Sequence, residues 1–90
     1  MGYLQAREMA KATDLDTALW WHLTANHYPP FVEPGLSMLM TVAREAVGCA
    51  HDPDRDIELP DGLSFRHRRT AKVQDVIETL HLAPFIERDD

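Results

Sequence analysis

The stretch "WWHLTANHYPPF", residues 20–31, constrains the fold of this chain more than any other. It holds four of the chain's seven aromatic residues, and the pair Pro29–Pro30 lies near its end. The residue before a proline avoids helical backbone angles, so a helix that precedes this pair must end there. We therefore expect a helix end, in which His22 packs or hydrogen-bonds on the inner face and Asn26 or His27 satisfies the last carbonyls.

The length and composition indicate a single soluble globular domain over residues 1–90. Ninety residues are too few for two separate cores, and 44% hydrophobic with 27% charged residues is ordinary for a globular chain. No apolar run approaches the roughly 18 residues that span a bilayer. The N-terminal segment "MGYLQAREMAKATD" lacks the apolar stretch of a signal peptide, and the single Cys49 excludes an internal disulfide. We expect a cytoplasmic protein without membrane contact.

Periodicity predicts a mainly α, small α+β fold, with three to four helices and one short β-hairpin before the last helix. The helices are expected within residues 2–12, 13–26, 33–50 and 70–81. Thr13 or Asp14 can cap the second helix, and Thr70 the last. In the third helix the apolar stripe is expected to be Leu36, Leu39, Met40, Ala43 and Val47.

The hairpin is expected in "IELPDGLSFRH", residues 57–67, where apolar and polar residues alternate on both sides of Asp61–Gly62. The segment "LAPFIE" is expected to fold back after the last helix and close the core. The predicted core residues are Leu19, Leu23, Leu36, Met40, Ala43, Val47, Phe65, Val73, Ile77, Leu80 and Phe85.

Trp20 and Trp21 are the strongest functional indication in the chain. Adjacent residues on a helix point about 100° apart, so both indoles can hardly face the centre of a small core. We expect one tryptophan in the core and the other at the edge of the core or in an interface, where tryptophan is enriched. Together with Tyr28 and Phe31, the exposed indole would supply an apolar anchor for a partner.

The charges separate into an acidic loop and a basic patch within a chain of net charge −6. The loop "DPDRDIELPD" carries Asp52, Asp54, Asp56, Glu58 and Asp61. The patch "RHRRTAK" carries Arg66, Arg68, Arg69 and Lys72 without an acid. Three interpretations stay open for the Arg66–Arg69 patch: a solvated face that pairs with the acidic loop, contact with an acidic protein, and contact with an anion or nucleic acid.

Metal and catalytic chemistry receive little support. His22 and His27 are five residues apart, about 140° on a helix, whereas the zinc motif H-E-x-x-H needs a spacing of four. The acidic loop begins like an EF-hand, but Ile57 replaces the required glycine and Leu63 the final glutamate. No phosphate-binding glycine loop or activated nucleophile is present, so we expect no cofactor, no metal and no enzymatic activity.

The segments "ALWWHLTANHYPPF", "IELPDGLSFRHRRTAKV" and "LHLAPFIE" resemble small uncharacterised proteins of actinobacteriophages and related prophages. The resemblance covers most of the chain beyond about residue 13. It implies a protein made in the bacterial host cell that acts by binding one host or phage protein, and it assigns no residue a role.

The sequence therefore predicts a non-enzymatic protein–protein interaction module, which could also be a homodimer. Its contact surface would combine Trp20 or Trp21 with Tyr28 and Phe31, rimmed by Arg66, Arg68 and Arg69. The alternative is a small nucleic-acid-binding regulator that places the Arg66–Arg69 patch against phosphates.

Overall fold

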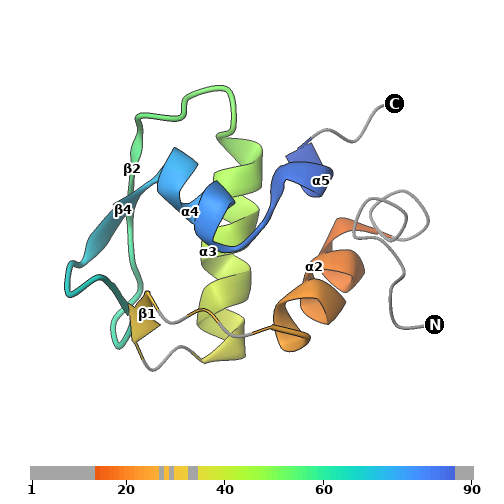
Figure 1. Cartoon of the computed structure of the whole chain (residues 1–90), viewed down its shortest axis with the longest axis horizontal. Coiled ribbons are helices and arrows are strands. Elements are labelled where there is room, and N and C mark those ends of the chain that lie inside the picture. The colour runs from red at the N-terminus through yellow and green to blue at the C-terminus, as the bar shows by residue number, and fades with distance from the viewer. Residues whose placement is uncertain (1–13, 27, 29, 33–34, 87–90) are drawn as a thin grey trace.

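The computed structural model describes residues 14–26, 28, 30–32 and 35–86 (Figure 1). Along the chain the elements are α2 (Leu15–Thr24), β1 (Phe31–Val32), α3 (Leu36–Gly48), β2 (Asp56–Glu58), β3 (Ser64–Phe65), β4 (Thr70–Lys72), α4 (Val73–Thr79) and α5 (Ala83–Ile86). The predicted fold class, a mainly helical small α+β domain, is confirmed. The helix expected within residues 2–12 lies outside the described residues.

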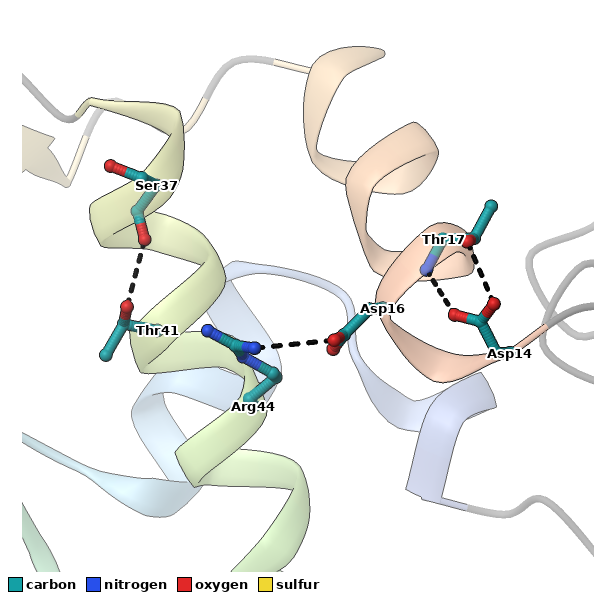
Figure 2. A network of polar contacts seen from close by, with 6 residues as sticks. All are labelled: Asp14, Asp16, Thr17, Ser37, Thr41 and Arg44. Atoms are coloured by element: carbon teal, nitrogen blue, oxygen red, sulfur yellow. Dashed lines mark hydrogen bonds and ion pairs between the residues drawn. The ribbon is translucent and has the colours of Figure 1, made fainter.

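Helix α2 begins at a side-chain cap and is tied to α3 by an ion pair (Figure 2). The Asp14 carboxylate accepts hydrogen bonds from the Thr17 amide at 2.9 Å and the Thr17 hydroxyl at 3.1 Å, as an N-cap does. These bonds hold the pKa of Asp14 below its usual value. Two residues further along, Asp16 lies 3.4 Å from Arg44 of α3. Of the two predicted caps, Asp14 is the one used, and Thr13 lies outside the described residues.

Helix α3 runs through the middle of the molecule, with α2 on one side and β2 and β4 on the other (Figure 1). Its buried face consists of Leu39, Val42, Ala43 and Ala46. The predicted apolar stripe matches this face only at Leu39 and Ala43. Its other members, Leu36, Met40 and Val47, are only half-buried. The difference arises because α2 and α4 both pack on α3. The most buried positions are therefore those between the two neighbours, where small side chains let the backbones approach.

The strands form two antiparallel pairs, and neither is the pair that the sequence predicted. Strand β2 pairs with β4, and β1 with β3. Ile57 lies opposite Ala71, and Phe31 lies opposite Phe65. An antiparallel pair does precede α4, but residues 57–59 do not pair with residues 63–65 across Asp61–Gly62. The expected Thr70 cap is also wrong, because Thr70 lies in β4 and α4 begins only after Lys72.

The turn at Asp61–Gly62 is real, although it joins no hairpin. The Leu63 amide donates to the Pro60 carbonyl at 3.1 Å, and Gly62 has a φ of 92°. A positive φ at the third residue of a four-residue turn is the feature that favours glycine. After this turn the chain pairs with β1 rather than returning along β2, which separates the two strand pairs.

The core lies between α2, α3, α4 and the strand pairs. Its buried residues are Ala18, Leu19, Leu23, Tyr28, Phe31, Leu39, Val42, Ala43, Ala46, Ile57, Leu59, Leu63, Phe65, Ala71, Val73, Val76, Leu80, Leu82 and Phe85. Of the predicted core, Leu36, Met40, Val47 and Ile77 only pack against its edge. The expected closure by "LAPFIE" is confirmed, because Leu82 and Phe85 are buried. Each helix in the described ranges falls short of the length and apolarity that a bilayer span requires.

Two glycine substitutions should change stability in opposite directions. Gly48 ends α3, and the space that a Cβ would occupy there is open, so Gly48→Ala should raise the free energy of unfolding by about 0.5–1 kcal/mol. At Gly62 the positive φ penalises any side chain, so Gly62→Ala should lower it by about 1–2 kcal/mol. Urea denaturation measures both, and changes of the same sign would contradict the assigned backbone geometry.

Candidate functional site

Both tryptophans lie on the outer face of α2. Trp20 is 46% exposed and Trp21 58%, and they are the two large hydrophobic residues exposed in the described part of the chain. Exposed Thr17 and Thr24 lie one turn before and after them on the same side of the helix. We call these four residues the tryptophan face. The prediction that one tryptophan belongs to the core is wrong, because the buried face of α2 is opposite.

Tyr28 and Phe31, which the sequence assigned to the contact surface, are buried instead. Tyr28 is 6% exposed and Phe31 3%. The Phe31 ring lies 4.9 Å from that of Phe65, its partner across the β1–β3 pair. The Tyr28 hydroxyl donates to the His22 carbonyl at 3.4 Å, and burial raises the pKa of Tyr28. Both rings close the core under the end of α2 and cannot anchor a partner.

His22 serves the structure at the point where α2 meets the end of α4. Its Nε2 lies 2.7 Å from the Leu80 carbonyl, which can only accept, so this nitrogen carries the proton. The imidazole also meets the Phe85 ring edge-on at 5.1 Å. At the end of α2, Asn26 donates to the His22 carbonyl at 3.1 Å, as predicted. His27, the second candidate of the pair, lies outside the described residues.

The described residues contain no group of three or more His, Cys, Asp or Glu side chains that could hold a metal ion. His22 does border a groove of about 440 Å³ together with His81. The other residues that line this groove are Ile77, Glu78, Ala83 and Pro84. The surface that lines this groove is mainly apolar, and the His22 Nε2 is already bound to the Leu80 carbonyl.

The basic patch lies on a two-residue hairpin turn that the sequence did not reveal. Phe65 and Arg68 exchange both backbone hydrogen bonds at 2.9 Å, with Arg66 and His67 between them. Arg66 has a φ of 52° and His67 a φ of 67°. Positive φ at both central residues defines a type I′ turn, which usually carries Asn-Gly. The Arg66 amide also donates to the Pro30 carbonyl at 2.8 Å, which fixes the turn against the segment before β1.

The four cations of the patch have different surroundings. Arg69 pairs with Asp61 at 2.9 Å, and Lys72 with Asp56 at 3.4 Å, so the acidic loop and basic patch meet within one chain. The Arg66 guanidinium stacks 5.0 Å above the Phe65 ring. Within the described ranges, no carboxylate forms an ion pair with Arg66 or Arg68.

A groove of about 560 Å³ lies beside this turn, and we call it the arginine groove. It is lined by Asp56, Phe65, Arg66, Arg68, Thr70, Ala71, Lys72 and Asp75. Helix α2 and strand β4 lie at opposite ends of the molecule (Figure 1). The tryptophan face and the arginines therefore do not form the single surface that the sequence predicted.

Searches of protein-family models, curated proteins and solved structures found no match to this chain.

Removal of the His22 imidazole should destabilise the fold. His22→Ala leaves the Leu80 carbonyl without its donor and should lower the free energy of unfolding by about 1–3 kcal/mol. His51→Ala, at an exposed loop position, is the matched control and should stay within about 0.5 kcal/mol. Urea denaturation with and without EDTA distinguishes the roles, since a loss of stability on chelation would support a metal site instead.

Relief of the positive φ at His67 should stabilise the hairpin turn. His67→Gly removes a side chain from left-handed backbone and should raise the free energy of unfolding by about 0.5–1 kcal/mol. Thr70→Gly, in extended backbone of β4, should lower it by a similar amount of about 0.5–1 kcal/mol. Thermal and urea melts of both variants would refute the turn assignment if His67→Gly were the more destabilising.

Proposed function

We propose that this protein is a non-enzymatic interaction module that binds another protein through the tryptophan face. The observation that carries the proposal is the exposure of two adjacent indoles, Trp20 and Trp21, on one helix. The other large apolar side chains whose burial the structure describes are buried or pack against the core. Retention of two such side chains at the surface favours a role in contact over a role in folding.

The physical properties of the face suit a protein partner. Tryptophan combines a large apolar surface with an indole N–H donor and is enriched among the residues that dominate binding energy. Thr17 and Thr24 border the indoles with short polar side chains. The Thr24 hydroxyl already donates to the Trp21 carbonyl at 3.0 Å, which satisfies part of the helix end. An apolar centre with a polar border is the usual arrangement of a protein interface.

The class of partner that we propose rests on the predicted resemblance to small actinobacteriophage proteins. Such proteins often act on one host or phage protein, so we assign the tryptophan face to a partner of that kind in the bacterial cytoplasm. A second copy of this chain, bound as a homodimer, is the alternative occupant of the same face.

Truncation of both indoles should abolish binding without unfolding the domain. The variant Trp20→Ala/Trp21→Ala should keep its helical circular dichroism and a cooperative melt, because neither side chain belongs to the core. In a pull-down from an actinobacterial lysate it should retain its partner at least about tenfold less than the native chain. The aromatic control Trp20→Phe/Trp21→Phe should retain most of the binding.

Three other outcomes have defined meanings. Equal recovery of the same partner by native and alanine variants would refute the tryptophan face. Dimerisation in sedimentation velocity that the alanine variant loses would identify a second copy as the occupant. Unfolding of the alanine variant would assign the indoles to stability instead.

The nucleic-acid alternative has weaker support. Of the four cations in the patch, Arg69 and Lys72 already face carboxylates, and the chain is acidic overall. Arg66 and Arg68 alone provide a small electrostatic footprint for a phosphate backbone. Recovery of many nucleic-acid-associated proteins in the same pull-down, lost on nuclease treatment, would favour this alternative.

A further inference from the structure

One edge of β4 faces away from its partner strand. The Leu59 amide donates to the Arg69 carbonyl and the Val73 amide to the Arg55 carbonyl, both at 2.9 Å. Backbone groups in an antiparallel pair point alternately toward and away from the partner. The amide and carbonyl of Thr70, and the amide of Lys72, therefore point away from β2. Strand β4 lies at the outside of the molecule (Figure 1), so this edge faces outward.

The hairpin turn explains why this edge has no partner among the described strands. Arg68 uses its outward backbone groups in the two bonds to Phe65. Beyond that point β3 leaves β4 and pairs with β1. Thr70 lies two residues after Arg68. It is therefore the first residue of this edge whose outward amide and carbonyl have no described strand opposite them.

The arginine groove lies at this same edge, with arginines at one end and carboxylates at the other. Thr70, Ala71 and Lys72 of β4 form one wall, and Arg66 and Arg68 lie at the turn end. At the other end Lys72 is paired with Asp56, and Asp75 supplies a further carboxylate. The turn end thus presents two guanidinium groups without a described carboxylate partner, next to an open strand edge.

A second copy of this chain does not suit the edge. Antiparallel pairing of two β4 strands about Thr70 would place Arg68 of each copy opposite Lys72 of the other. Like charges directly opposite one another destabilise a strand pair. Charged residues on a short edge strand are a common protection against self-pairing. An occupant with the opposite charge would remove this repulsion.

We propose that the β4 edge binds an extended acidic segment of a partner protein, which adds as a strand along Thr70–Lys72. Its backbone groups bond to the outward groups of Thr70 and Lys72, and its carboxylates reach Arg66 and Arg68. Main-chain bonds provide affinity in this mode of recognition, and the side chains provide specificity. This contact does not rest on the tryptophan face, which lies at the other end of the molecule.

The test uses fluorescein-labelled peptides of sequence Glu-X-Glu-X-Glu-X-Glu, with X as Val, Thr or Phe, in anisotropy titrations at low ionic strength. At least one peptide should bind the full chain, and Arg66→Glu/Arg68→Glu should weaken it at least about tenfold. The matched pair is Arg68→Glu and Arg69→Glu, each a single charge reversal. Arg69→Glu should weaken binding less than about threefold, and less than Arg68→Glu does, because Arg69 pairs with Asp61 outside the groove. Trp20→Ala/Trp21→Ala should bind the peptide as the native chain does.

The backbone contribution is tested separately from charge. Thr70→Pro removes the outward amide and leaves the bonds between β2 and β4 intact, so it should fold and bind at least about tenfold more weakly. If Thr70→Pro fails to fold, a peptide N-methylated at alternate residues should lose binding to the native chain instead. Equal affinity of the methylated peptide would reduce the site to charge alone and refute strand addition. Absence of any binding at millimolar peptide, or equal loss with Arg69→Glu, would also overturn the proposal.

Discussion

Burial of one face of α3 is the constraint on which the rest of the structure depends. Helices α2 and α4 and strand β2 all pack on this helix. Ala43 and Ala46 are completely buried between these neighbours, so the backbones can approach closely without large side chains. The cluster of leucine and phenylalanine side chains from the surrounding elements then fills the remaining space. The orientation of α2, and with it the outward position of both tryptophans, follows from this packing.

Local sequence signals predicted α2, α3 and α4 but neither the short helix α5 nor the strand partners, for a physical reason. Helical periodicity and the Asp14 cap are properties of neighbouring residues, and both can be read directly from the chain. Strand pairing depends on residues far apart, such as Phe31 with Phe65, which no short window contains. The Arg66–His67 turn was missed because it lacks the glycine or asparagine that normally marks positive φ. At Asp61–Gly62, where glycine is present, the turn was found but its partner strands were not.

The errors at the candidate site came from an assumption about the core rather than from the helix itself. From the sequence, His22 was expected on the inner face of α2, and Leu19 and Leu23 in the core. On a 3.6-residue helix these three residues share one face, and neither tryptophan falls on it. Core size led to the expectation that one indole must be buried. The structure supplies that volume from Tyr28, Phe31 and Phe85 instead. The four aromatic residues that were predicted to share one contact surface are therefore divided. Tyr28 and Phe31 lie in the core, and Trp20 and Trp21 lie at the surface.

The two proposed surfaces would differ in their type of recognition. The tryptophan face presents apolar side chains from a helix, so its affinity would depend on how well a partner excludes water from two indoles. The β4 edge presents backbone groups beside Arg66 and Arg68, so its affinity would depend on an extended conformation and on ionic strength. Because α3 lies between α2 and β4, a partner on one proposed surface would not cover the other. If both proposals hold, the domain would bind two partner segments at once, with an extended one along β4.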